Sequence, residues 1–371
     1  MANIMNNLLQ SLIQDWITIL LAVFAFALLY LSVKSNQKPA RKLPPGPLFR
    51  WPILGNLPSL DPKEPYKTIN QLAQKYGPVY RLQFGSFPVL ILNDFESVRQ
   101  AFLKQGAEYD DRPKILVLNG PSGKGLVRAH SSMVQRIRRR FALTAFRDLG
   151  MGKCKLEDQI AEEIQRRNPD IAEWFDDEDF VACVGDLFGA ATETTSTTLK
   201  WGLLYMVLQP DIQENVQAEL DSVAQRNRMP SLKDRPQLPY TEATLLEIQR
   251  IGSVAPLGVP RATTIDTKLC GFDIPQGTMV IPNLWAIHHD ERIWKEAESF
   301  KPERFLDSDG KVNRREELIP FSIGKRKCLG EQLALMELFL IFTHLLHRFS
   351  FRLPEGAQPS LEPEMGMTLV P

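Results

Sequence analysis

One cysteine, in a loop rich in glycine and basic residues, constrains this chain more than any other feature. The loop reads Pro320-Phe321-Ser322-Ile323-Gly324-Lys325-Arg326-Lys327-Cys328-Leu329-Gly330, and an apolar run from Leu333 to Leu346 predicts a buried helix behind it. Gly324 and Gly330 permit backbone shapes and close approaches that a side chain would forbid. Arg326 and Lys327 would favour the deprotonated sulfur, so we expect Cys328 to be a thiolate. The alternative is a buried, inert cysteine.

The spacing of this loop is that of a known cofactor site. Phe-x-x-Gly-x-Arg-x-Cys-x-Gly resembles, at every fixed position, the haem-binding loop of the cytochromes P450. The resemblance implies that Cys328 is the metal ligand of a haem b, with Phe321, Gly324, Arg326 and Gly330 around the cofactor. A thiolate ligand pushes electron density onto the iron and favours cleavage of the O–O bond. It also implies the family's fold, mainly α with a small β sheet.

Charge and cysteine content narrow the remaining classes. The 371 residues carry 44 basic and 44 acidic side chains, a balance that argues against nucleic acid as a partner. The four cysteines are far apart and form no CxxC pair, so neither a zinc site nor a disulfide framework is indicated. We expect the catalytic part to face a reducing compartment.

The N-terminus predicts a membrane anchor. Residues 1–15 would form a short luminal segment, and Trp16 to Val33 is an uncharged apolar run long enough to cross most of a bilayer. Basic residues follow the run, which places the next domain on the cytosolic side. The alternative is a cleaved secretory signal, but the run is longer than such signals and has no small-residue cleavage site after it.

A spacer and then the catalytic domain follow the anchor. Residues 34–50 are basic and contain Leu43-Pro44-Pro45-Gly46-Pro47, which cannot be helical. By resemblance this is the proline-rich hinge of P450s of the endoplasmic reticulum membrane, and 51–371 is the catalytic domain. We expect a hairpin over 79–84 and 89–92, and helices over 96–103, 135–143, 179–208, 211–226 and 240–251.

A carboxylate and a guanidinium, Glu247 and Arg250, lie one turn apart on a predicted helix. Alone, such a pair is more often an exposed ion pair of little consequence. Phe300-Lys301-Pro302-Glu303-Arg304-Phe305 follows at the family's interval, and the resemblance makes Arg304 the third member of a buried network. Its implied role is folding and haem retention.

The long central helix carries a threonine cluster, Ala190-Ala191-Thr192-Glu193-Thr194-Thr195. A threonine inside a helix can donate to the carbonyl four residues earlier, here that of Ala190, and leave a polar notch. The alternative is ordinary helix threonines. By resemblance, Glu193 and Thr194 are the catalytic pair that relays protons to dioxygen. Ala191 departs from the family, which more often has glycine there.

Cations for the haem carboxylates are also implied. Arg139, Arg261 and Arg326 fall where the family binds propionates. Gln135 stands where the family has a tryptophan, so one donor to a propionate is lost. The neighbouring arginines read as a solvated face, although a basic surface would suit an acidic electron-transfer partner.

Compared with members of the family, the chain is short between two of its predicted helices. Only Thr144 to Glu178 separates the basic helix from the central helix, whereas family members have several helices there, on the order of a hundred residues. The join falls near 164–167. The lost elements would roof the substrate pocket and cover the central helix around Phe180 to Leu187. The chain also ends at Pro371, before the family's last strand pair.

The sequence therefore predicts an incomplete P450 with an N-terminal transmembrane helix, of the animal family-two type. Leu238-Pro239-Tyr240-Thr241-Glu242-Ala243 suggests that subgroup. The implied reaction is insertion of one oxygen atom of O2 into small lipophilic substrates of xenobiotic, fatty acid or steroid class. NADPH–cytochrome P450 reductase would supply electrons, with cytochrome b5 as a second candidate donor. The alternatives are a truncated, non-catalytic, membrane-anchored isoform that keeps the reductase-docking face, and a membrane protein unrelated to haem.

Overall fold

The computed structural model describes residues 14, 16, 18–20, 23, 41–114, 124–127, 129–148, 177–224, 228–357 and 359–371. It divides into two compact units, Met1–Leu43 and Pro44–Pro371. Among the described residues there is no helix long and apolar enough to cross a membrane. Most of the predicted anchor, 16–33, lies outside the described residues, as does the predicted join near 164–167. Both therefore stay predictions.

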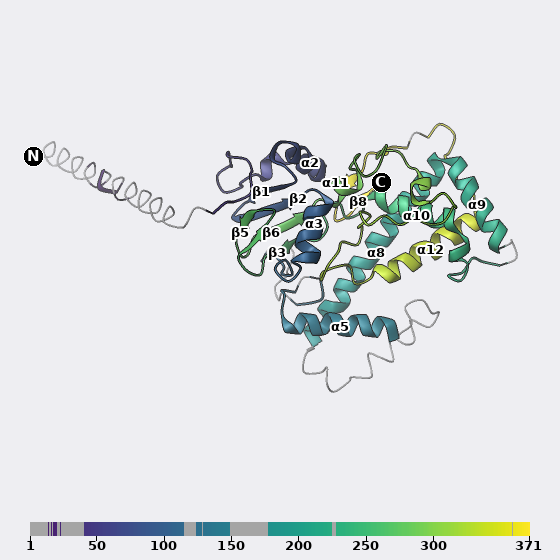
Figure 1. Cartoon of the computed structure of the whole chain (residues 1–371), viewed down its shortest axis with the longest axis horizontal. Coiled ribbons are helices and arrows are strands. Elements are labelled where there is room, and N and C mark those ends of the chain that lie inside the picture. The colour runs from purple at the N-terminus through teal and green to yellow at the C-terminus, as the bar shows by residue number, and fades with distance from the viewer. Residues whose placement is uncertain are drawn as a thin grey trace, which may run out of the picture. The chain divides into compact units, whose positions relative to one another are not determined.

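A four-stranded sheet lies at one end of the larger unit (Figure 1). Its strand order is β1-β2-β6-β3, with β2 antiparallel to β1 and parallel to β6. The β1–β2 hairpin turns at Gly85, whose φ of +57° a side chain rarely adopts. The strands of the four-stranded sheet are β1 Val79–Phe84, β2 Phe87–Leu92, β3 Arg261–Ala262 and β6 Met279–Pro282. A separate two-stranded sheet consists of β4 Thr267–Leu269 and β5 Phe272–Ile274.

Helices make up most of the rest of this unit (Figure 1). Among the described residues they are α2 Pro65–Tyr76, α3 Phe95–Arg99, α5 Met133–Asp148, α8 Asp177–Leu208, α9 Pro210–Ala224, α10 Pro239–Gly252, α11 Leu284–His288 and α12 Glu331–Arg348. The helices predicted from the apolar spacing are confirmed, with one change. The segment predicted as a single helix over 96–103 is α3 followed by a π-helical turn, Gln100–Lys104.

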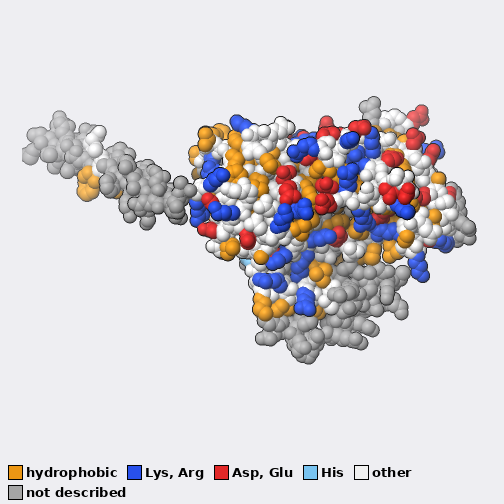
Figure 2. Space-filling view, in the orientation of Figure 1, with side chains coloured by type: hydrophobic (Ala, Val, Ile, Leu, Met, Phe, Trp, Pro, Cys, Tyr) orange, Lys and Arg blue, Asp and Glu red, His pale blue; other side chains and the backbone are white. Residues whose placement is uncertain are grey.

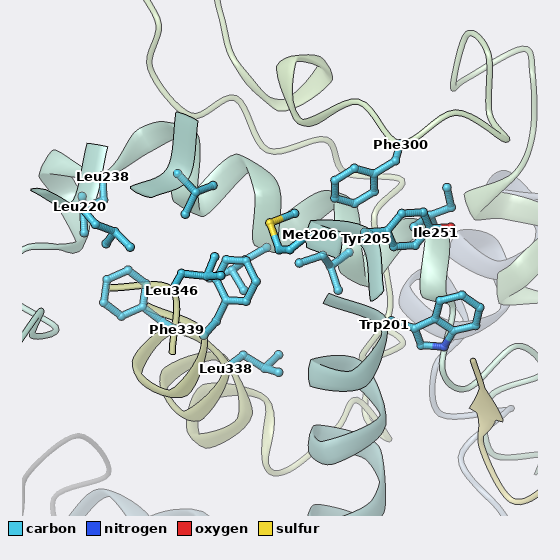
Figure 3. Packing of buried hydrophobic residues seen from close by; sticks show 14 residues of the cluster. Trp201, Tyr205, Met206, Leu220, Leu238, Ile251, Phe300, Leu338, Phe339 and Leu346 are labelled. Atoms are coloured by element: carbon cyan, nitrogen blue, oxygen red, sulfur yellow. The ribbon is translucent and has the colours of Figure 1, made fainter. Parts of the chain in front are cut away.

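The main core lies where α8, α9, α10 and α12 meet (Figure 3). From α12, Phe339 and Phe342 are fully buried, and Tyr205 of α8 stacks on Phe300 with ring centroids 4.4 Å apart. Full burial of a large apolar side chain contributes roughly 1.5–3 kcal/mol. This core fixes α8 and α12 against each other, and the cysteine loop leads directly into α12.

The C-terminal residues form a strand pair that the sequence analysis did not predict. β7 Glu364–Met365 is antiparallel to β8 Leu369–Val370. The pair is anchored at Leu369, whose amide donates to the Val254 carbonyl at 2.9 Å and whose carbonyl accepts from Trp201 Nε1 at 2.8 Å. It therefore places its turn against α8.

Candidate functional site: a cysteine loop, an arginine cluster and a central helix

The cysteine loop is a tight turn that points Cys328 outward. The Cys328 amide donates to the Phe321 carbonyl at 2.9 Å, and the Lys327 amide donates to the Gly324 carbonyl at 3.0 Å. Gly324 has a φ of +79°, and a Cβ there would lie 1.9 Å from the Phe102 carbonyl oxygen. Gly324 is therefore required. A Cβ on Gly330 would meet no atom within 4 Å, so the protein around it leaves open space beside the cysteine.

The electrostatics of the thiol differ from the sequence prediction. Cys328 is exposed, but the protein atoms around it desolvate the thiolate and raise its pKa above the ordinary value. Opposing this, the Gly330 amide and the charges of Arg139 and Lys327 lower the pKa. Lys327 therefore favours the thiolate as predicted, but desolvation by the surrounding protein outweighs it. Lys327 pairs with Glu331 at 2.6 Å, so its charge is partly neutralised.

Arg326 also departs from its predicted role at the sulfur. Its side chain turns inward and is 6% exposed, and its Nε donates to the Asp110 carbonyl at 2.9 Å and to Oδ1 of the same residue at 3.2 Å. Its Nη2 donates to the Ala129 carbonyl at 3.0 Å. Arg326 therefore ties the cysteine loop to residues two hundred positions earlier.

Four arginines gather behind the loop. Arg139 donates to the Lys327 carbonyl, and Arg261 donates to the Ile323 carbonyl at 2.6 Å while lying over the Phe102 ring. Arg112, which the sequence analysis did not place in the site, donates to the Pro260 carbonyl at 2.7 Å. Desolvation, and then the repulsion of their neighbours, lower the pKa of Arg112 and that of Arg261 to about 9 each.

The cluster has more donors than partners. Nη1 of Arg261 and Nη1 of Arg326 are buried and donate to no hydrogen-bond partner among the described residues. A buried donor left unpaired costs about 1–3 kcal/mol. Buried cations that repel one another, with unused donors, form a place for an anion. Gln135, the residue in the tryptophan position, instead places its amide 3.5 Å from the Leu126 carbonyl.

The structure brings Glu247, Arg250 and Arg304 together. Arg250 donates to both carboxylate oxygens of Glu247, at 2.7 and 2.8 Å, and Arg304 Nε donates to Oε1 at 3.0 Å. Glu247 and Arg250 are fully buried. Lys301 also donates its amide to Glu247, at 2.8 Å. The pairing is therefore not the exposed ion pair of the alternative interpretation.

On α8, Thr194 Oγ1 donates to the Ala190 carbonyl at 2.7 Å, the bond expected for a threonine inside a helix. Glu193 Oε1 accepts from Thr368 Oγ1 at 2.8 Å, so the C-terminal hairpin holds the carboxylate. The sequence analysis missed this contact. On the first half of α8, earlier than this pair, Val181 is 68% exposed and Phe188 is 73% exposed.

The chain is similar in sequence to known proteins of one family. The family model for cytochrome P450 matches residues 44–167 and 161–371. The chain is 32% identical to human cytochrome P450 2U1, over 91% of this chain and 89% of that protein. It is 30% identical to rat cytochrome P450 2J3, over 95% and 94%, and 32% identical to marmoset cytochrome P450 2D19, over 92% and 94%.

The chain belongs to the cytochrome P450 family. Its curated relatives above are P450s of family 2, so the family and subgroup predicted from the cysteine loop and the Leu238 segment are confirmed. The family is one of haem monooxygenases that receive electrons from redox partners, and this P450 is a member of that enzyme family.

The residues present in this P450 fit a haem. An exposed thiol stands beside open space at Gly330, and buried arginines with unused donors suit the two carboxylates that the porphyrin carries. Because a metal deprotonates a coordinating thiol outright, the raised pKa of Cys328 does not oppose ligation.

The comparison also shows how much is missing. The match to the human relative runs over 484 residues, whereas this chain has 371, so on the order of a hundred residues of that relative have no counterpart within the match. The two matches to the family model overlap at residues 161–167.

Charged side chains of both signs are interspersed over the face shown in Figure 2, in keeping with the balanced composition.

Proposed function

We propose that this chain is a haem-thiolate monooxygenase of the endoplasmic reticulum membrane. It would insert one oxygen atom of O2 into small lipophilic substrates of xenobiotic, fatty acid or steroid class. Electrons would come from NADPH through cytochrome P450 reductase, with cytochrome b5 as a second candidate donor. The observation that carries the proposal is the thiol of Cys328 beside an arginine cluster with unused donors.

Different residues of the site would bind the iron and the carboxylates of the cofactor. Cys328 would ligate the iron of haem b, and Arg112, Arg139, Arg261 and Arg326 would bind its carboxylates. Haem, when bound, supplies the activation of dioxygen and its insertion into a C–H bond.

Thr194 would hold a proton on Oγ1, and Glu193, whose Oε1 is held by Thr368, would replace that proton from solvent. The Glu247 network would keep the loop rigid.

The test is the spectrum of the reduced protein with carbon monoxide. The full chain, expressed in membranes, should show the red-shifted Soret band of a thiolate ligand, and Cys328→Ser should lose it. Cys270→Ser is the matched control, because Cys270 is a second exposed free thiol whose Sγ lies 3.4 Å from Gln100 Oε1. A Soret band that survives in Cys328→Ser would show that the ligand is another residue.

The membrane topology has its own test. The basic spacer should be open to a protease added outside sealed microsomes at Arg41 and Lys42, which are exposed just before the packed Pro44 segment. The basic residues after Val33 favour a cytosolic domain. Cleavage should release the catalytic domain. A domain that stays protected until detergent is added would show the opposite orientation.

One observation favours a second candidate function. Val181, Gly185 and Phe188 form an exposed stripe on α8, on the side that the absent segment would cover. We therefore keep the alternative of a non-catalytic, membrane-anchored isoform that retains the reductase-docking face. Haem content together with substrate-dependent NADPH consumption separates the two. Haem binding without substrate-dependent consumption would favour the isoform.

A further inference from the structure

A buried histidine links two parts of the proximal region that are far apart in sequence. His288, the last residue of α11, is 1% exposed. Its Nε2 lies 3.1 Å from the amide nitrogen of Ile319, which begins the cysteine loop segment. Its Nδ1 lies 3.0 Å from Ser253 Oγ, at the end of α10. The ring therefore spans the space between the Glu247 helix and the loop.

The hydrogen bonds fix the protonation of the ring. The Ile319 amide can only donate, so Nε2 must be the bare, accepting nitrogen. In the neutral ring Nδ1 then carries the proton and donates to Ser253 Oγ, which in turn donates to the Arg250 carbonyl at 2.8 Å. Desolvation lowers the pKa of His288 well below its ordinary value, in keeping with a neutral ring.

The contacts close into a circuit. Arg250, already bound to Glu247, donates Nη1 to the backbone carbonyl of His288 at 2.8 Å. On the other side, the Ile319 carbonyl accepts from the Ser322 amide at 2.9 Å, which starts the turn of the cysteine loop. Along this path the Ile319 amide, Arg250 Nη1 and the Arg250 carbonyl each have a partner on His288 or Ser253.

We propose that His288 is a positioning residue that holds the start of the cysteine loop in register with the Glu247/Arg250 network. Through Ile319 it sets where the turn at Ser322 begins, and through Phe321 it sets the position of the Cys328 amide. The importance of that register for iron ligation rests on the proposed function. The register itself does not, because it is a property of the chain's own hydrogen bonds.

Two substitutions separate the two ring nitrogens. In His288→Gln a terminal amide atom stands at the distance of Nε2 and can still accept from the Ile319 amide. In His288→Asn the terminal atoms reach only the position of Nδ1, so the amide of Ile319 loses its acceptor. His289→Asn is the control, because His289 stacks on Trp285 and its Nδ1 lies 2.9 Å from the Trp285 carbonyl.

Amide hydrogen exchange measured by mass spectrometry on the full chain, with or without haem, is the readout. We expect exchange of the peptide from Ile319 to Cys328 to rise about tenfold or more in His288→Asn, where Ile319 loses its acceptor. It should rise only about threefold in His288→Gln, which loses just the Nδ1 link to Ser253, and stay near wild type in His289→Asn. Unchanged exchange in His288→Asn, or an equal rise in His288→Gln, would overturn the proposal.

A second variant keeps the test decisive if His288→Asn does not fold. Ser253→Ala leaves His288 in place but removes its link to the Arg250 carbonyl. It should raise exchange of the same peptide by roughly threefold. No rise in a folded Ser253→Ala protein would overturn the link to Arg250. If haem binds, the thiolate Soret band should weaken in His288→Asn and be restored in His288→Gln, whereas failure of the proposed function would leave the exchange pattern intact.

Discussion

The side of the molecule behind the cysteine loop and the side along the first half of α8 are built in opposite ways. Behind the loop, Glu247 and Arg250 are fully buried and each has several partners. Along α8, the large apolar side chains of Val181 and Phe188 are mostly exposed. The Glu247 network is buried charge that is paired, although the arginine cluster behind the loop keeps two unused donors, whereas the first half of α8 carries apolar side chains that are exposed.

The difference separates two requirements of such a fold. A cofactor site needs precisely placed polar groups, and these come from segments that the chain retains. A substrate pocket needs apolar walls, and the first half of α8 carries large apolar side chains that are exposed. The buried polar network can therefore be fully formed while apolar surface elsewhere is uncovered.

The largest expected effect tests whether the proximal region depends on its buried charge. In Glu247→Ala, Arg250 would stay buried without its carboxylate, which costs about 3–5 kcal/mol for a broken buried pair. That is a large share of a domain's net stability of roughly 5–15 kcal/mol. Urea unfolding should show it. Glu96→Ala, at an exposed pair with Lys104, is the control and should leave the midpoint unchanged. If Glu247→Ala lowered the free energy of unfolding only slightly, the region would not depend on its buried charge pair.

Two phenylalanines test the contrast directly. Phe339→Ser, in the core of α12, should destabilise by about 3–5 kcal/mol, whereas Phe188→Ser on α8 should change stability by less than about 0.5 kcal/mol. Phe188→Ser should also reduce binding of the dye ANS and slow aggregation, because it removes exposed apolar surface. If Phe188→Ser proved as costly as Phe339→Ser, the stripe on α8 would have to be covered in solution.

The sequence predicted the parts of the site that lie within one motif. The cysteine loop, the helices that carry Glu247 and Thr194, and the hydrogen bond from Thr194 to the Ala190 carbonyl all follow from local spacing. The outward-pointing Cys328 was found because glycine and cysteine sit at fixed intervals.

What could not be predicted depends on contacts between distant segments. Asp110 draws Arg326 away from the sulfur, yet the two residues are 216 positions apart. Arg112 joins the cluster from a loop with no motif of its own, and Thr368 reaches Glu193 from a two-residue strand pair that carries no periodic signal. The pKa of Cys328 then follows from how much protein surrounds the thiol, which no spacing reveals.

A smaller loss of folding stability is expected at acidic pH. Desolvation, and then the charge of Arg250, lower the pKa of His289 to about 3 from an ordinary 6.5. Below pH 6.5 the unfolded chain therefore binds a proton that the folded chain does not, so stability falls as the pH falls toward 3. At pH 5 the loss should be about 2 kcal/mol relative to neutral pH.

His289→Gln separates this loss from other acid effects. The variant loses the stacking on Trp285 at every pH, so only the change in its difference from wild type is informative. Urea unfolding at pH 7.5 and pH 5 should show that difference shift by about 2 kcal/mol in favour of the variant. A difference that does not depend on pH would show that His289 is protonated in the folded protein, and that this side of the molecule is less tightly closed than its buried contacts indicate.

The smallest effect on stability is expected at Thr194, within α8. Thr194→Ala removes one hydrogen bond within α8 and replaces threonine with a better helix former, so the free energy of unfolding should change by only a few tenths of a kcal/mol. If Thr194 delivers a proton to bound oxygen, the same change should divert NADPH electrons from hydroxylated product to hydrogen peroxide. The matched control is Thr192→Ala, an exposed threonine two residues earlier on the same helix, which should leave the ratio of peroxide to product unchanged.

Peroxide and product are measured together with NADPH consumption in protein loaded with haem. An unchanged ratio in Thr194→Ala would remove the proton role, and the threonine cluster would then be ordinary helix sequence. A changed ratio without a change in stability would show that the chemistry of α8 is intact, although the apolar surface along its first half is bare.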